Sequence, residues 1–393
     1  MQSHLKIELN GPVLLLMGPI GNFFARFARY LIKKRIPVYK IMFPLHEFAI
    51  PKQCQHRFDK SMDEWRPFLV KFLQTYQIKQ LYMYGDFIEP HKIAIEEATK
   101  LGLKVYVFEL GYVRPYYVTV EEGRVNARSN LNKPVEFYEK LPEVVNLSLP
   151  QHTGLLWRKL FMAPTFIQHA LTNYTIIAGD HKLQPKPSYL YFQMIGYFRY
   201  FKYQLTEYSL RKKLSKLPSH FLVPLQVSID SQITLASNYP TIEMFIMEIL
   251  ESFGANAAKD TFLIFKHHPR DRGYNNYAQF IRQKAYEMNL MDRVYYVHDA
   301  DLLELYRNCQ GVITVNSSVG LSSLLNDIPT KALGKTFYNL PGLTSQCSLD
   351  EFWQSPGKVN RSLFKKFYNY LITHTQINAD FHGKFPFDEV FVA

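Results

Sequence analysis

The sequence predicts an α/β protein with two doubly wound, Rossmann-like domains. Two series of short apolar runs alternate with segments of helical spacing, one in residues 12–108 and the other in residues 221–333. Strands that alternate with helices in this way form parallel sheets. The length of 393 residues is also too great for one ordinary core and suits two domains.

The first series begins with a buried strand that leads into a tight loop, Gly18-Pro19-Ile20-Gly21. We expect Asn22 to cap the helix that follows this loop. Gly102 ends a later helix, and residues 116–126 suggest a small hairpin. The predicted strands and helices of this series cover residues 12–17, 22–35, 37–43, 63–76, 81–84, 91–101 and 103–108.

The second series follows an aromatic stretch that has helical spacing without strand signals. Its predicted elements cover residues 221–226, 240–253, 261–265, 276–288, 293–297, 301–308, 311–315, 318–327 and 330–333, and a terminal helix covers 361–374. We therefore divide the chain into Rossmann-like domains at 1–150 and 218–345, a helical linker at 151–217 and a helical tail at 346–393. This is the anatomy of the GT-B architecture, in which a central cleft separates the two domains. A fold alone does not give a function.

The composition is that of a globular protein, with 47% hydrophobic and 20% charged residues. Purely apolar stretches such as residues 13–17 are far shorter than the roughly 18–20 residues that span a bilayer. The N-terminus lacks the features of a signal peptide, so we expect a cytoplasmic protein. Cys54, Cys309 and Cys347 are scattered and suggest neither a disulfide framework nor a zinc site.

The net charge of +12 has three candidate partners: nucleic acid, an anionic membrane surface, or anionic small substrates. No nucleic-acid-binding motif is present in the sequence. Cations lie beside aromatic residues in residues 197–216 and again in 364–370. An interfacial helix uses this mixture, with rings at headgroup depth and cations on lipid phosphates. An ordinary solvated helix whose rings pack inward explains the same pattern equally well.

Glu109 and Asp230 are the candidate catalytic carboxylates. Each follows a predicted strand, at the edge where open α/β sheets bind ligands. Transfer of a sugar with retention of configuration can use two carboxylates, one as nucleophile and one as acid/base. Phe108 and Tyr112 beside Glu109 would raise its pKa toward an acid/base role. The alternatives are a helix-capping Asp230 and a Glu109 that is paired with Arg114.

Two further strand ends carry groups that suit anions. Lys266-His267-His268-Pro269 precedes Arg270 and Arg272, and this cationic setting fits a phosphate. Adjacent residues of a strand face opposite ways, so the two His rings rarely bind one metal. Asn316-Ser317-Ser318-Val319-Gly320 begins a predicted helix, where hydroxyls and N–H groups make an anion site. Structural histidines and an ordinary serine cap are the alternatives.

Several nucleotide and metal motifs are missing from the sequence. Neither a GxGxxG fingerprint nor a P-loop occurs, which argues against NAD- and ATP-dependent chemistry. There is no Asp-x-Asp triplet to hold a nucleotide-bound metal, and Asp299 and Asp301 are expected to be helix caps. We expect no metal and no cofactor.

Taken together, these segments resemble the capsule polysaccharide biosynthesis proteins of Gram-negative bacteria, in their single-domain, KpsS-type branch. The resemblance extends from Gly18 to Gly383, and the combined motifs are specific although each alone is weak. It is carried by residues 108–115, 119–126, 226–233, 266–273 and 316–320. That family is similar to the retaining β-Kdo transferases, whose donor is CMP-β-Kdo.

The resemblance implies a role for each matching residue. Asp230 would be the nucleophile and Glu109 the acid/base, although Leu110 stands where a polar residue is more usual. The donor domain, 218–345, would bind CMP-Kdo through Gln226, Lys266, His267, His268, Pro269, Asn316, Ser317, Ser318 and Gly320. The acceptor-side domain, 1–150, would contribute Gly18, Gly21, Asp86, Tyr112 and Arg114.

The leading hypothesis is that the protein transfers the first Kdo from CMP-β-Kdo to a phosphatidylglycerol-type lipid in capsule linker biosynthesis. It would act on the inner face of the inner membrane, bound peripherally to the anionic surface, with other capsule biosynthesis or export proteins as possible partners and no nucleic acid. The alternatives are a non-catalytic capsule export or assembly protein that binds lipid-linked glycan, and an inverting CMP-sugar transferase.

Overall fold

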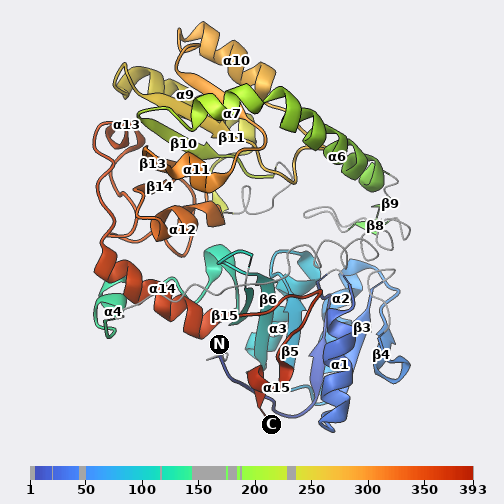
Figure 1. Cartoon of the computed structure of the whole chain (residues 1–393). Coiled ribbons are helices and arrows are strands. Elements are labelled where there is room, and N and C mark those ends of the chain that lie inside the picture. Colours follow the sequence, from blue (N-terminus) through green and yellow to red (C-terminus); the bar gives the residue numbers. More distant parts are fainter. Residues whose placement is uncertain are drawn as a thin grey trace. The chain divides into compact units, whose positions relative to one another are not determined.

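The computed structural model describes residues 5–19, 21–43, 50–115, 117–143, 188–227 and 236–392, and the short strands β8 (Tyr174–Thr175) and β9 (Gln184–Pro185). The chain forms two compact units (Figure 1). Unit 1 comprises Met1–Leu131, Val145–Pro187 and Tyr368–Ala393, and unit 2 comprises Asn132–Val144 and Ser188–Phe367. The N- and C-terminal segments of the chain therefore belong to the same unit.

Unit 1 contains a seven-stranded sheet with the order β15-β7-β6-β5-β2-β3-β4. The five strands from β2 to β6 are parallel, whereas β7 and β15 are antiparallel to their neighbours. The strands are β2 (Val13–Leu15), β3 (Val38–Met42), β4 (Gln55–Arg57), β5 (Gln80–Tyr84), β6 (Lys104–Leu110), β7 (Val118–Glu122) and β15 (Gln376–Ile377). Counted along the chain, the parallel strands have the order 3-2-1-4-5, which is the Rossmann order 3-2-1-4-5-6 without its last strand.

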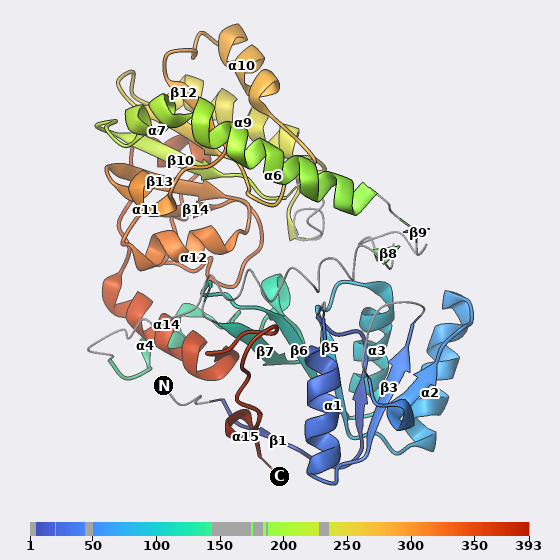
Figure 2. The same ribbon diagram turned by 45° about the vertical axis from the view of Figure 1, so that its right-hand side comes forward.

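Helices cover both faces of the sheet of unit 1 (Figure 2). They are α1 (Phe23–Lys33), α2 (Trp65–Thr75) and α3 (Glu89–Lys100), with short 3-10 turns at Lys52–Cys54, Met62–Glu64 and Asn126–Arg128. Helix α1 packs in one apolar cluster, and α2 and α3 pack in the cluster of the opposite face. Because both faces are covered, β2 is fully buried and reads in the sequence as a continuous apolar run.

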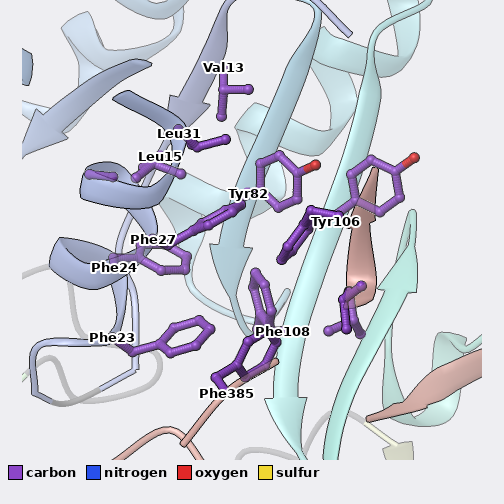
Figure 3. Packing of buried hydrophobic residues seen from close by; sticks show 14 of the residues in the cluster. Val13, Leu15, Phe23, Phe24, Phe27, Leu31, Tyr82, Tyr106, Phe108 and Phe385 are labelled. Atoms are coloured by element: carbon purple, nitrogen blue, oxygen red, sulfur yellow. The ribbon is translucent and has the colours of Figure 1, made fainter. Parts of the chain in front are cut away.

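Aromatic rings dominate the core between α1 and the sheet (Figure 3). Phe23 and Phe27 are one helical turn apart, so both rings face the sheet, where the Phe108 ring lies 5.2 Å from that of Phe23. Phe385, from the C-terminal segment, packs 4.9 Å from Phe23. Full burial of one such ring contributes about 1.5–3 kcal/mol to the free energy of unfolding. The C-terminal segment is therefore part of the core of unit 1.

Unit 2 contains a five-stranded sheet with the order β12-β11-β10-β13-β14, and all its strand pairs are parallel. The strands are β10 (His220–Pro224), β11 (Phe262–Lys266), β12 (Val294–Val297), β13 (Cys309–Thr314) and β14 (Thr330–Ala332). The helices of this sheet are α9 (Ile242–Asn256), α10 (Ala278–Glu287), α11 (Leu302–Tyr306), α12 (Ser318–Leu325) and α13 (Leu349–Phe352). This sheet also has the 3-2-1-4-5 order, so two Rossmann-like units confirm the predicted α/β class.

Three further helices belong to unit 2: α4 (Val135–Glu139), α6 (Ser188–Thr206) and α7 (Tyr208–Leu214). Helices α6 and α7 occupy the second half of the predicted linker and are helical as expected, whereas its first half contains β8 and β9, which pair as a small antiparallel sheet that the expectation missed. The predicted terminal helix is also present as α14 (Arg361–Thr375), which begins in unit 2 and ends in unit 1. The central cleft between the two domains stays a prediction.

Several details differ from the sequence-based expectations. The side chain of Asn22 makes no capping hydrogen bond at the start of α1. Residues 116–126 are not a separate hairpin, because β7 pairs with β6. The tail is not only helical: β15 joins the large sheet of unit 1, and α15 (Phe387–Val390) leads into β16 (Phe391–Val392), which pairs with β1 (Ile7–Glu8). Strands of two residues carry no periodicity that a sequence can show.

Candidate functional site

In unit 1, three predicted site segments lie side by side at the carboxyl edge of the sheet. Strands β2, β5 and β6 are neighbours, and backbone hydrogen bonds continue beyond their ends. The N–H of Tyr84 donates to the carbonyl of Met17 at 2.8 Å, and the N–H of Gly85 donates to the carbonyl of Phe108 at 2.9 Å. The strand order reverses between β2 and β5, so the loops at Gly18 and Asp86 flank the usual ligand site of such sheets, and the end of β6 lies next to them.

Glu109 is the last but one residue of β6 and is half-buried. Its Oε1 accepts a hydrogen bond of 2.8 Å from the N–H of Leu110. Burial raises the pKa of Glu109, and this effect outweighs the opposite effects of the Leu110 bond, the Arg114 cation and a hydrogen bond with Tyr84. A raised pKa makes the carboxylate a stronger base than that of an exposed glutamate, which suits an acid/base role.

Asp86 follows β5 and is fully buried. Its Oδ1 lies 3.2 Å from the Arg128 guanidinium, and its Oδ2 accepts a 3.4 Å hydrogen bond from the N–H of Val125. The negative charge of Asp86 contributes to the raised pKa of Glu109, so the two carboxyl groups are close enough to influence each other. Asp86 is an acidic neighbour of Glu109 that is itself neutralised by Arg128.

Tyr112 and Arg114 follow β6, and both have contacts within unit 1. Tyr112 is buried, its hydroxyl donates to Glu121 at 2.6 Å, and the same oxygen accepts from the N–H of Asn126 at 2.7 Å. The N–H of Tyr112 donates to the side-chain oxygen of Gln376 at 3.0 Å. Arg114 is exposed, and its Nε donates to the carbonyl of Gly111 at 3.3 Å. Tyr112 thus joins the end of β6 to β7 and β15.

Two glycines in this region fit their positions for backbone reasons. A Cβ atom on Gly111 would lie 2.0 Å from the carbonyl oxygen of Tyr117, so a larger residue would force the two backbones apart. Gly21 has a φ of 111°, which is a conformation that favours glycine. Gly21 therefore allows the turn that leads from the loop at Gly18 into α1.

Glu121 is a buried acid in this region that the sequence did not single out. It lies on β7, and it accepts hydrogen bonds from Tyr112, from the Ser129 hydroxyl at 2.5 Å and from the N–H of Asn130 at 3.1 Å. Burial, the largest effect, raises its pKa to about 7. Glu121 shares a face of the sheet with Glu109, because Thr119 pairs with Glu109 and lies two residues before Glu121.

In unit 2, the predicted donor-binding residues lie at the carboxyl ends of β10, β11 and β13, which are adjacent strands. Gln226 follows β10 and Asn316 follows β13, on the two sides of the point where the strand order reverses. The Gln226 amide donates to Oδ1 of Asn316 at 2.9 Å, and the N–H of Asn316 donates to Oε1 of Gln226 at 3.2 Å. The two loops are thus joined at the position where ligands bind in sheets of this kind.

The segment after Asn316 begins α12 as predicted. Ser317 is the N-cap, and its hydroxyl accepts a hydrogen bond of 3.2 Å from the N–H of Val319. Ser318 is the first helical residue and is half-buried. Gly320 is buried, and a Cβ atom there would lie 2.4 Å from the hydroxyl of Tyr338. That hydroxyl donates to the carbonyl of Ser317 at 2.6 Å, so Gly320 makes room for a tyrosine that holds the cap.

The His-Pro segment follows β11, and its two histidines point to different surroundings. His267 is buried, and its Nδ1 lies 2.7 Å from the hydroxyl of Tyr296. Burial, the largest effect, and the nearby groups His298, His268, Arg272 and Lys266 together lower the pKa of His267 to about 3, so its ring is neutral. His268 is half-buried, and its Nδ1 accepts from the N–H of Arg270 at 3.1 Å. Pro269 is exposed. The two histidines therefore differ in burial and in hydrogen-bond partner.

Lys266 ends β11 and lies close to an ion pair. Burial lowers its pKa, while the negative charges of Asp299 and Asp301 raise it. Arg272 pairs with Asp299 at 3.0 Å. Asp301 is the N-cap of α11 as expected, since its carboxylate accepts from the N–H of Leu303 at 2.7 Å. The expectation that Asp299 is also a cap was wrong, because its carboxylate neutralises Arg272.

A second cluster of polar residues lies beside His267, and the sequence did not predict it. His298 is buried, and Glu207 accepts hydrogen bonds from both its backbone N–H, at 3.0 Å, and its ring Nδ1, at 2.5 Å. The Tyr203 ring stacks on the His298 ring at 3.6 Å and an angle of 9°. Tyr203 and Glu207 come from α6 and the turn after it, so this cluster attaches α6 to the sheet of unit 2.

Asp230 lies in residues 228–235, outside the described part of the chain, so its role stays a prediction. In the described ranges, no group of three or more His, Cys, Asp or Glu side chains is placed to hold a metal ion. Within the same ranges, no helix has the length and apolar character that crossing a membrane requires.

These observations define the class of the protein: an α/β protein whose two Rossmann-like units each carry polar and ionisable groups at the ligand-binding edge of the sheet. Residues 79–382 match the family model described as "Capsule polysaccharide biosynthesis protein", and the chain belongs to this family. The resemblance inferred from the sequence is thereby confirmed.

Relatives of known name cover nearly the whole chain. The capsule polysaccharide modification protein LipB of Neisseria meningitidis serogroup A is 33% identical over 95% of this chain and 92% of its own length. The capsule polysaccharide export protein KpsS of Escherichia coli is 33% identical over 96% of this chain and 99% of its own length. Among solved structures, the β-Kdo 2,7-transferase of Thermosulfurimonas dismutans KpsC is similar, with 12% identity, a TM-score of 0.43, and coverage of 91% of this chain and 88% of that one.

Proposed function

We propose that the protein is a retaining β-Kdo glycosyltransferase. It transfers the first Kdo from CMP-β-Kdo to a phosphatidylglycerol-type lipid, including the lyso form, during synthesis of the capsule linker. The observation that carries the proposal is the half-buried carboxyl of Glu109, whose pKa is raised, at the end of β6, the strand next to the switch point of unit 1. Membership of the capsule polysaccharide biosynthesis family supports the choice of a capsule substrate.

The donor is assigned to unit 2. The Gln226–Asn316 pair organises the switch point there, and Lys266 and His268 follow the adjacent strand. These groups supply amide, ammonium and imidazole donors, which suit the phosphate of CMP and the carboxylate of Kdo. His267 is buried and neutral, and its hydrogen bond with the Tyr296 hydroxyl holds the start of this segment in place.

In the first step, a carboxylate oxygen of Asp230 attacks the anomeric carbon of Kdo. The bond from this carbon to the phosphate oxygen breaks, and CMP leaves with the bonding electrons. CMP is a stable anion, so it needs no proton in order to leave. The product of this step is a Kdo ester of Asp230 with inverted configuration.

In the second step, a hydroxyl of the lipid glycerol attacks the same carbon from the opposite face. The ester bond to Asp230 breaks, and the carboxylate is restored. The deprotonated Glu109 accepts the proton of the attacking hydroxyl. Burial raises the pKa of Glu109, which makes its carboxylate a stronger base than an exposed glutamate. Two inversions give net retention.

The proposed location is the cytoplasmic face of the inner membrane, where the lipid acceptor lies. The protein would bind there peripherally and would work with other capsule biosynthesis or export proteins. We propose that the reaction needs no metal ion, since the cationic groups beside His268 supply the positive charge that the donor requires.

Donor selectivity tests the assignment of unit 2. A bound ligand at about 100 times its Kd stabilises a protein by about 2.7 kcal/mol, which a thermal-shift measurement detects. CMP and CMP-Kdo should raise the melting temperature, and UDP-glucose should not. CMP should then be released from CMP-Kdo over many turnovers only when a phosphatidylglycerol acceptor is added, because without it the reaction stops at the Kdo ester of Asp230. Equal stabilisation by UDP-glucose would contradict the donor assignment.

The alternative is a non-catalytic export or assembly protein, which the name of the Escherichia coli relative favours. Such a protein would bind lipid-linked glycan without releasing CMP. Binding of a lipid-linked oligosaccharide, together with no CMP release above the rate without enzyme, would support this alternative. An inverting transferase would release CMP but would give the opposite anomer.

A further inference from the structure

Helix α6 has two different faces, and one of them is fixed to unit 2. Arg199 donates from Nη1 to the carbonyl of Arg272 at 2.7 Å, and the Phe192 ring lies 4.7 Å from that of Tyr274. A Cβ atom on Gly273 would lie 2.1 Å from the carbonyl oxygen of Phe192, so helix and loop are in direct backbone contact. Together with the Glu207–His298 bonds, these contacts fix which face of α6 points away from unit 2.

The opposite face carries a continuous row of exposed apolar side chains. Seven of the thirteen large hydrophobic side chains that are exposed in the described part of the chain lie here. We call them the aromatic stripe: Tyr191 (62% exposed), Met194 (70%), Tyr197 (66%), Phe198 (73%), Phe201 (65%), Leu205 (81%) and Tyr208 (66%). Six of them follow one another at intervals of three and four residues, which places them on one side of a helix. A concentration of this kind marks an interaction surface.

The chemistry of the stripe fits the interfacial region of a bilayer. Tyr and Phe rings are the side chains that lie at headgroup depth in membrane-bound proteins. Helix α6 contains no Asp or Glu, so nothing in it repels anionic lipid phosphates. Lys202 and Lys212 are exposed beside the stripe. With 19 residues, α6 is about 28 Å long, and it can lie along the membrane surface over this length.

The structure also shows which cations of this region already have contacts within unit 2. Arg211 donates to the carbonyls of Tyr203 and Gln204, and Lys213 lies over the Tyr295 ring at 4.7 Å. These two cations, like Arg199, therefore have contacts within unit 2. The rings of the stripe, aided by Lys202 and Lys212, are left as the main contributors to membrane affinity.

The second aromatic and cationic segment, residues 364–370, does not belong to this surface. Phe364 and Phe367 are fully buried in unit 2, and Tyr368 is buried in unit 1. The expectation that this segment docks on a membrane was therefore wrong for these three rings, and Tyr370 is half-buried. Both helices combine aromatic and cationic residues, but the rings of the stripe on α6 are exposed, whereas Phe364, Phe367 and Tyr368 of α14 are buried.

We propose that the aromatic stripe of α6 and α7 docks the protein on anionic bilayers. This inference rests on the proposed function, because a lipid acceptor requires contact with the membrane. The inference goes beyond that function because it names the residues that contact the membrane. A second copy of this chain or another protein would be different occupants of the stripe, and the experiment separates them.

Binding of the full chain to phosphatidylglycerol-containing vesicles, measured by flotation, tests the proposal. The variant Phe198→Ser/Phe201→Ser should bind at least about tenfold more weakly, since each ring loses its burial in the interface. Tyr286→Ser is the matched control, because Tyr286 is 74% exposed on α10, outside the stripe, and its replacement should leave binding unchanged. Lys202→Gln/Lys212→Gln should weaken binding at low salt and have less effect at high salt.

The depth of the stripe in the bilayer, measured by fluorescence quenching, gives a second readout. A Phe198→Trp variant should be quenched by brominated lipids, whereas Tyr286→Trp should not. Equal vesicle binding by Phe198→Ser/Phe201→Ser and the wild type would overturn the proposal. Light scattering that shows a dimer for the wild type and a monomer for this variant would instead assign the stripe to a second copy.

An acceptor with a short, soluble acyl chain separates this proposal from the proposed function. The stripe variant should transfer Kdo to the soluble acceptor at the wild-type rate and should lose transfer to vesicle-bound acceptor. If the wild type transfers to neither acceptor but still binds vesicles through the stripe, the docking surface stands and the proposed function fails.

Discussion

Gln226 and Asn316 hold each other across the switch point of unit 2, although they are 90 residues apart. The Gln226 side chain donates to the Asn316 side chain and accepts from the Asn316 backbone N–H. Each residue follows one of the two strands between which the strand order reverses. A single side-chain pair therefore sets the spacing of the two loops that we assign to the donor.

Removal of the Gln226–Asn316 pair should lower the catalytic efficiency with the donor. We expect Gln226→Ala and Asn316→Ala each to reduce kcat/KM for CMP-Kdo by about 10–100-fold, because a freed loop no longer holds its polar groups in position. The double variant should lose little more than either single one, since the two residues act as one unit. Gln283→Ala, at an exposed position of α10, is the control. Additive losses in the double variant would refute the coupling.

The carboxylates are the most direct test of the chemistry. Glu109→Gln and Asp230→Asn should each lower kcat by at least about 100-fold, since each removes a proton acceptor or a nucleophile. The melting temperature should stay close to that of the wild type. Glu122→Gln, at an exposed position of the neighbouring strand, should keep full activity. Near wild-type turnover in either carboxylate variant would show that its role is assigned wrongly.

Glu121 should make stability depend on pH. Its folded-state pKa is about 7, whereas its ordinary value is 4.5, so the folded chain binds more protons than the unfolded chain between these pH values. The free energy of unfolding should therefore fall as the pH rises from about 4.5 to about 7. In Glu121→Gln this decrease should be smaller, by on the order of 1–3 kcal/mol between pH 5 and 8. Denaturant unfolding at pH 5 and pH 8 measures this decrease, and Glu122→Gln is the control. The same pH dependence in Glu121→Gln as in the wild type would contradict the prediction.

The attachment of α6 should be sensitive to Glu207. A Glu207→Gln change replaces one carboxylate that accepts two hydrogen bonds from His298, and we expect a loss of about 1–3 kcal/mol in the free energy of unfolding. Glu243→Gln, at an exposed position of α9, should change stability by less than about 0.5 kcal/mol. Chemical denaturation compares the two, and equal stability of both variants would mean that α6 is held by its other contacts.

Metal dependence is a separate test. We expect activity to persist after treatment with EDTA, because the groups around Lys266 and His268 supply the positive charge for the donor. Measurement of CMP release before and after chelation, with Mg²⁺ added back as the control, decides the point. Loss of activity that Mg²⁺ or Mn²⁺ restores would show that a metal ion takes part.

The sheets were predictable because parallel strands that are buried on both faces read as short apolar runs. The strands β2, β3, β5 and β6, and all five strands of unit 2, lie within about two residues of the predicted ranges. The strand β4 (Gln55–Arg57) is polar, and β15 and β16 have two residues each, so none of them has a pattern to detect. The aromatic core of unit 1 joins α1 to the C-terminal segment, and no local signal reveals such a pairing.

The candidate site was predictable only in part, for a related physical reason. Glu109, Gln226 and Asn316 stand at strand ends, a position that the sequence pattern identifies. Glu207 and Gln376 were missed, because each meets its partner across a long stretch of chain. Glu121 was missed as well, since only its burial distinguishes it from the exposed glutamate beside it.

The product of the reaction tests the central claim most directly. The purified full chain is incubated with CMP-β-Kdo and a phosphatidylglycerol analogue, and the product is analysed by mass spectrometry and NMR. Our account predicts an acceptor that is heavier by one Kdo residue, linked as the β-anomer, and no such product with Asp230→Asn. An unmodified acceptor under conditions in which CMP-Kdo is bound would contradict the transferase assignment. A product linked as the α-anomer would contradict the retaining mechanism.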